Sequence, residues 1–168
     1  MSADRAGYAA KQAALLAALL RGGDLPAGFS AAGARAASRS LRRKRVGAVR
    51  PAWPALAVAL GASFDERFDA FARTTGPPAF GEGLADGLAF VSSLARPQEL
   101  GDDVRVELLF ARALLVRDRR RGGGDWRPRR APYVHIARLH HPHRLLFVVH
   151  LPGLGRRHAA VALIPTSG

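Results

Sequence analysis

The chain has 168 residues, which is enough for one domain with a small appendage, and 48% of them are hydrophobic. It contains no Cys, which excludes disulfides, thiolate metal sites and thiol nucleophiles, and no apolar run reaches the ~18 residues that span a bilayer. The formal net charge of +13 indicates an acidic or polyanionic partner. Without Cys, a secretory pattern or a membrane span, the chain is expected to be cytoplasmic and to have no membrane partner.

Hydrophobic periodicity predicts a bundle of about five helices in residues 1–118. The first amphipathic helix covers Ala3 to Arg21 and ends at the Gly pair that follows. Ser30 is expected to cap a second helix, which Pro51 and Pro54 kink or break. Pro54 suits the first position of a further helical piece, which Gly61 closes.

Three later segments complete the predicted helical part. Ser63 and Glu66 fit a capping box, and the helix that they start carries a stripe of aromatic residues and ends at Thr74. This stripe consists of Phe64, Phe68 and Phe71. Further helices are predicted over Glu82–Ala95 and from Gly101 to about Asp118, where the acids at the start suit the positive end of the helix dipole.

The composition and the hydrophobic pattern of the sequence change after residue 118. Residues 119–132, RRRGGGDWRPRRAP, are polar and rich in Gly and Pro, and they indicate a linker. Tyr133–Leu139, Arg144–Leu151 and His158–Pro165 have strand character, and short loops join them. The predicted class is therefore α+β: a helical bundle domain over 1–118, a linker over 119–132 and a small antiparallel three-strand meander over 133–168, which needs the helices or a partner to cover it.

The basic residues are unevenly placed. No acid lies between Asp24 and Asp65, whereas bases crowd residues 35–50 and 117–130. The candidate partner- or polyanion-binding arginines are Arg39, Arg42, Arg43, Arg45, Arg50, Arg119, Arg120 and Arg121. Two interpretations of the basic helix stay open, which are contact with phosphates and a solvated outer face. No helix-turn-helix, zinc-finger or RNA-recognition signature accompanies it, so base-specific readout is not expected.

Metal, cofactor and catalytic sites are not expected. All the histidines lie in the C-terminal part, where no carboxylate is available to complete a metal site. They are His135, His140, His141, His143, His150 and His158. Ser92 and Ser93 have no nearby His, and Gly122–Gly124 is not followed by a helix pattern that would make it a phosphate loop. No nucleophile, base and orienting group come together, so the chain is predicted not to be an enzyme.

One order of motifs resembles a known family. These motifs are Leu41-Arg42-Arg43-Lys44-Arg45-Val46, Trp53-Pro54-Ala55-Leu56, Leu60-Gly61 and the segment Phe64 to Phe71. Together they resemble the helical N-terminal domain, also labelled a DNA-binding domain, of the accessory proteins that partner multinuclear non-heme iron oxidative enzymes, including those of methanobactin biosynthesis. The resemblance covers about Ala10 to Val116. Where that family has Tyr-Arg-x-Asn, this chain has Leu41 to Arg45.

The resemblance implies an accessory protein that docks on an iron enzyme and helps to present a precursor peptide, while the iron and the chemistry belong to the partner. It carries over Arg42, Arg43, Arg45 and Trp53-Pro54 as interface residues, although a place in the core is the expected role of Trp53. The residues themselves suggest a mechanism in which clustered Arg attracts an acidic surface and the sheet offers an edge strand to an extended peptide.

Two other functions stay open. The chain could bind nucleic acid without sequence preference through residues 35–50 and 117–130, with an affinity that falls steeply as salt rises. It could also be a self-associating scaffold, with Leu146 and Val148 on an exposed face of the sheet.

Overall fold

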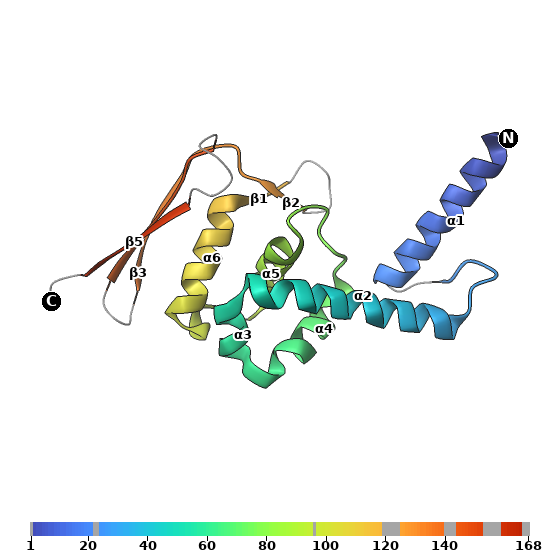
Figure 1. The fold of residues 1–168 in the computed structure, drawn as a ribbon, viewed down its shortest axis with the longest axis horizontal. Helices are drawn as coiled ribbons and strands as arrows, with labels where there is room; N and C mark the ends of the chain where they lie inside the picture. The colour runs from blue at the N-terminus through green and yellow to red at the C-terminus, as the bar shows by residue number, and fades with distance from the viewer. Residues whose placement is uncertain are drawn as a thin grey trace.

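The computed structural model describes residues 2–21, 24–95, 97–118, 125–139, 144–152 and 159–165, without the side chains of residues 2–5, 21, 97–98 and 159–165. The fold is α+β, as predicted, with helices followed by two small antiparallel sheets (Figure 1). The α-helices are α1 Ser2–Arg21, α2 Ala31–Ala52, α3 Pro54–Leu60, α4 Phe64–Thr74, α5 Glu82–Ser93 and α6 Asp102–Leu114. Two short 3₁₀ helices lie at Gly61–Ser63 and Pro97–Leu100. In the described residues, no helix is both long and apolar enough to cross a membrane.

The helices do not form one even bundle. Helices α2 to α6 surround a common core, whereas α1 projects from them and meets the rest of the molecule near its C-terminal end (Figure 1). At this contact the Ser38 hydroxyl donates to the Leu19 carbonyl at 2.9 Å. The predicted bundle is therefore only partly matched, because most apolar residues of α1, such as Tyr8 and Leu16, stay exposed.

Local signals account for the start and end of α2. The Ser30 hydroxyl accepts from the Gly33 N–H at 3.4 Å, so the predicted cap is confirmed. Pro51 stays inside α2, and the chain breaks at Trp53, whose φ of −136° and ψ of 63° are not helical. Pro54 then begins α3, where its missing N–H costs nothing.

The predicted capping box at Ser63 is wrong. Ser63 has helical dihedrals and lies at the end of the 3₁₀ turn that leads into α4, so it is not an extended cap residue. Its hydroxyl donates back to the Leu60 carbonyl at 2.7 Å.

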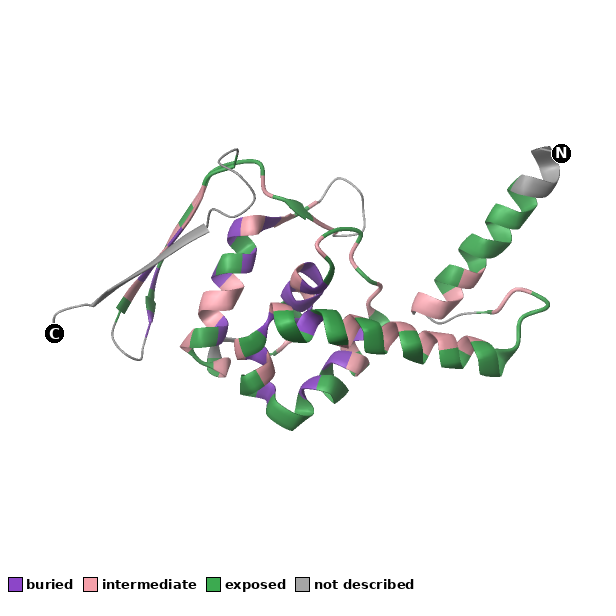
Figure 2. Ribbon diagram, in the orientation of Figure 1, coloured by how far each residue is buried: buried purple, intermediate pink, exposed green. Residues whose placement is uncertain are grey.

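The core lies where α2, α3, α4 and α5 meet, and Figure 2 shows the buried residues converging there. The Phe64 and Phe68 rings pack against the Phe90 ring edge to face, with centroids 6.1 Å and 5.2 Å apart. Helix α5 lies close against α2, since a Cβ on Gly83 would be 2.0 Å from the Ala48 carbonyl oxygen. Glycine is therefore required at this point of the helix–helix contact.

Helix α6 ends at Leu114, earlier than the predicted Asp118. Leu115–Arg117 forms strand β1, which pairs antiparallel with β2, Trp126–Pro128, inside the segment that the sequence indicated as a linker. Leu115 has extended dihedrals, so the helix ends there. In this conformation the Leu115 side chain, which is only 3% exposed, lies in the core. Hydrogen bonds from Arg129 N–H to Leu114 C=O and from Asp118 N–H to Asp125 C=O hold this pair.

The second sheet consists of β3 Tyr133–Leu139, β4 Arg144–His150 and β5 Ala159–Pro165, in the order β3-β4-β5. Each strand begins and ends within one residue of the predicted bounds, because turn residues flank each run of strand character. One face packs on α6, where Leu109 and Ala113 contact the Leu146 and Val148 side chains. Both strand residues are fully buried, so their predicted role on an exposed self-association face is wrong.

Candidate partner-binding surface

Helix α2 carries the arginines that the sequence marked as candidates, and the structure divides them into two groups. The first group forms ion pairs inside the molecule. Arg42 lies 2.7 Å from Asp69, Arg45 lies 2.7 Å from Asp86 and Arg50 lies 2.5 Å from Asp65. These carboxylates belong to α4 and α5, so acids that are distant in sequence neutralise three of the seven basic residues in the segment 35–50.

Arg45 is a structural residue. Its guanidinium donates to both carboxylate oxygens of Asp86, and also to the carbonyls of Ala72, Thr75 and Gly76 at the end of α4. Only 11% of its side chain is exposed. Because its donors are satisfied within the fold, we assign Arg45 to the joining of α2, α4 and α5.

Trp53 is also structural. Its side chain is fully buried, and its indole N–H donates to the Leu84 carbonyl at 3.1 Å. Arg50 stays half exposed, with its guanidinium over the Phe64 ring at 5.0 Å and beside Asp65. The interface role that the sequence suggested for Trp53 therefore gives way to a role in packing.

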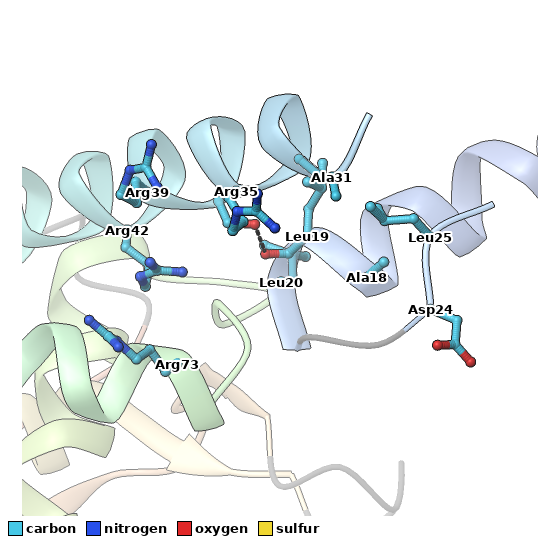
Figure 3. A pocket seen from close by; sticks show the side chains of 12 residues that line it. Ala18, Leu19, Leu20, Asp24, Leu25, Ala31, Arg35, Arg39, Arg42 and Arg73 are labelled. Carbon is cyan, nitrogen blue, oxygen red and sulfur yellow. Dashed lines mark hydrogen bonds between the residues drawn. The ribbon is translucent and has the colours of Figure 1, made fainter. Parts of the chain in front are cut away.

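The second group of basic residues on α2 is exposed and, within the described part of the chain, forms no ion pair. It consists of Arg35, Arg39, Arg43 and Lys44. Arg35 and Arg39 lie one helical turn apart, on the side of α2 that faces the end of α1 (Figure 3).

A hollow of about 670 Å³ lies between α1, α2 and α4, and we call it the Arg-lined hollow. Its basic side is formed by Arg35, Arg39, Arg42 and Arg73, and its apolar side includes Leu19, Leu20 and Leu25 (Figure 3). Asp24 is the acid that lines it, on the side away from Arg42 and Arg73. The hollow therefore combines an excess of positive charge with an apolar wall.

A second hollow of about 590 Å³ adjoins the first along α2 and α4. It shares Arg39, Arg42 and Arg73 with the Arg-lined hollow and adds Arg43. Asp69 lines the second hollow, where it accepts from Arg42 at 2.7 Å and from Arg73 at 2.7 Å. Burial raises the pKa of Asp69, but hydrogen bonds from Arg73 and Arg42 outweigh it, so the net pKa is lowered. One carboxylate thus holds two guanidinium groups in place at the edge of both hollows.

A family model described as "SCO6045-like, C-terminal domain" matches residues 9–96, which is more than half of the chain. The chain belongs to this SCO6045-like family. No curated protein and no solved structure matches the chain. The family region includes every residue of the SCO6045-like chain that lines the Arg-lined hollow, and it ends before α6 and both sheets begin.

Other candidate residues of the SCO6045-like chain lie elsewhere. Arg119, Arg120 and Arg121 are outside the described residues, as are His140, His141, His143 and His158. His135 stacks on the Tyr133 ring with centroids 6.1 Å apart, and His150 Nε2 lies 3.3 Å from the Arg129 carbonyl. Among the residues that the structure describes, no group of three or more side chains is placed to hold a metal ion.

Sequence reasoning missed two groups that shape this region. Arg73 enters the Arg-lined hollow from α4, and only its i,i+4 spacing from Asp69 hinted at the pair. Glu107 of α6 accepts from the Ala55 and Leu56 N–H groups at 2.7 Å and 3.0 Å, which caps the start of α3. No sequence signal indicates this cap, because the carboxylate comes from a helix about fifty residues away.

Proposed function

We propose that this SCO6045-like chain is a non-catalytic accessory protein that docks on a partner protein and helps to present a peptide substrate to it. The observation that carries the proposal is the Arg-lined hollow, in which Arg35 and Arg39 are exposed beside an apolar wall and form no ion pair with any described residue. An acidic protein segment with an apolar side chain fits such a hollow, because carboxylates pair with guanidinium forks while the apolar group leaves water.

The nature of the partner follows from the resemblance to accessory proteins of multinuclear non-heme iron enzymes. The resembling segment, about residues 10–116, contains the whole Arg-lined hollow. By this analogy the partner is an iron-dependent peptide-modifying oxidase, and the metal and the chemistry belong to the partner.

Among the described strands none pairs with the edge of β3 that faces away from β4, and this edge is a suitable place for the peptide. Arg105 of α6 donates to the Arg138 carbonyl at 2.7 Å, so this carbonyl points away from β4. Alternate residues of an antiparallel edge strand direct their N–H and C=O groups outward, and Val134 and Ile136 therefore share this direction. An extended peptide can pair with these groups by strand addition.

Nucleic-acid binding is the second candidate function, and the exposed row of Arg35, Arg39, Arg43 and Lys44 favours it. The internal pairs of Arg42, Arg45 and Arg50 leave fewer free charges than the sequence alone implies. Four phosphate contacts predict a slope of about −3.6 in log affinity against log salt for duplex DNA.

The deciding experiment is retention of proteins from host lysate on the tagged chain, with and without nuclease. We expect one acidic protein to survive nuclease treatment and to be lost with the double substitution Arg35→Gln/Arg39→Gln. The matched control is Arg67→Gln/Arg112→Gln, which removes the same charge from exposed arginines outside the hollow and outside both basic segments. Retention that disappears with nuclease supports the nucleic-acid function, and equal retention by both double variants overturns the role of the hollow.

A further inference from the structure

The sheet β3-β4-β5 has a second face, opposite to the one that α6 covers, and we call it the outer sheet face. On β3 it carries Val134 and Ile136, which are 63% and 57% exposed. On β4 the register places Val149 beside Val134, Phe147 beside Ile136 and Leu145 beside Arg138. The positions opposite these on β5 are Ala160, Ala162 and Ile164. All the positions except Arg138 are apolar.

An outer face of this composition is unusual for an antiparallel sheet. Such a sheet normally alternates between apolar residues toward the core and polar residues toward water. Here the outer face is apolar as well as the part of the inner face that α6 covers through Leu109 and Ala113, and no described element covers the outer face. In layered folds a sheet that is apolar on both faces is covered on both.

We infer that the outer sheet face binds an amphipathic helix of a partner protein, with acidic residues at one end of the helix. The face measures roughly 14 by 24 Å, from the usual strand spacing and rise of three seven-residue strands. A helix of about 16 residues is about 24 Å long and ~10 Å wide, so it matches the face in length and covers most of its width.

Charge determines the chemistry of this helix. Arg138 lies on the outer sheet face, whereas Arg144, which pairs with the buried Leu139, lies at the same end of the sheet on the inner side. Arg138 is exposed, and in the described part of the chain it forms no ion pair. Carboxylates on the end of the helix that lies over Arg138 complement this charge.

A second copy of the chain is a poor occupant by comparison. The face offers about 340 Å², well below the ~800 Å² per partner of a stable interface. Two chains with a formal charge of +13 each would also bring Arg138 toward like charges. A small face is sufficient as the second contact of a partner that the Arg-lined hollow already holds, and to this extent the inference rests on the proposed function.

The test is a titration of the full chain with a synthetic 16-residue helical peptide that has Leu on one face and Glu at one end. We expect Val134→Thr/Ile136→Thr to weaken its binding by roughly tenfold, because the substitutions remove apolar contact while Thr keeps strand propensity. Replacing the Glu residues of the peptide by Lys should weaken binding similarly. The control variant is Val58→Thr on α3, since Val58 is 81% exposed and distant from the sheet, and it should leave the affinity unchanged.

Three results would overturn the inference: equal affinity of the wild type and the double Thr variant, absence of binding by the Glu peptide, or a dimer that the double Thr variant dissolves. The last would make a second copy the occupant. Arg35→Gln/Arg39→Gln should leave the peptide affinity unchanged, which separates this inference from the proposed function. Loss of lysate retention alone concerns the Arg-lined hollow, and loss of peptide binding alone concerns the outer sheet face.

Discussion

Arg45 and Asp86, forty-one residues apart, form a bidentate ion pair in which Nε lies 2.8 Å from Oδ2 and Nη2 lies 2.7 Å from Oδ1. Asp86 is 3% exposed and is buried within α5, while Arg45 extends from α2 to the carbonyls that end α4. A single guanidinium therefore joins three helices. The pair also explains how a strongly basic helix can lie against the core without an acid of its own.

Substitution of Asp86 by Leu should destabilise the fold by roughly 3–5 kcal/mol, because it leaves the Arg45 charge buried without a carboxylate. The double substitution Arg45→Met/Asp86→Leu should recover part of this loss, since no unpaired charge remains. Urea unfolding of Asp86→Leu, Arg45→Met and the double variant measures the difference. If the double variant is as unstable as the sum of the single ones, the two side chains are not coupled.

Gly87 and Gly83 should not tolerate a side chain. A Cβ on Gly87 would lie 2.1 Å from the Trp53 Nε1 atom, and one on Gly83 would lie 2.0 Å from the Ala48 carbonyl oxygen. We expect Gly87→Ala and Gly83→Ala each to cost about 2 kcal/mol or more in thermal or urea unfolding. The control is Gly47→Ala in α2, where a Cβ meets open space and where Ala should stabilise the helix by about 0.5–1 kcal/mol. Stabilisation by Gly83→Ala would contradict the observed α2–α5 contact, and stabilisation by Gly87→Ala would contradict the contact between Gly87 and Trp53.

Glu107→Ala should destabilise the protein by about 1–3 kcal/mol, because the N–H groups of Ala55 and Leu56 lose their acceptor. Glu107→Gln should cost less, since one amide oxygen can still accept while the charge at the helix start is lost. Glu66→Ala is an informative control, because Glu66 is exposed and the capping box that the sequence suggested for it is not formed. Equal effects of Glu107→Ala and Glu66→Ala would refute the cap from α6.

Asp69 should make stability depend on pH. Its pKa in the folded state is lowered below the ordinary 3.8 by the guanidinium groups of Arg73 and Arg42. Its contribution is therefore present above the ordinary pKa and is lost as the pH falls through the lowered value. Unfolding free energy measured between about pH 5 and pH 2 should fall more steeply for the wild type than for Asp69→Asn. Parallel curves would mean that the pKa of Asp69 is the same in the folded and unfolded chain.

Much of the secondary structure could be predicted because its signals are local. Pro54 begins α3 and Ser30 caps α2 through contacts within a few residues, and the three strands of the larger sheet follow their alternating pattern. Predictions failed where a distant group decided the outcome. Leu115 leaves α6 because its side chain enters the core, and Leu146 and Val148 are buried because α6 covers them.

The candidate site shows the same division. The sequence by itself determined that the chain is strongly basic, that α2 carries most of the candidate arginines and that the strands after residue 132 have no acid. Only the tertiary structure decided which arginines are free, because Asp65, Asp69 and Asp86 reach α2 from other helices. It also decided which face of the sheet stays uncovered. An ion pair or a helix–sheet contact depends on distance in space, whereas composition and periodicity report only on neighbours along the chain.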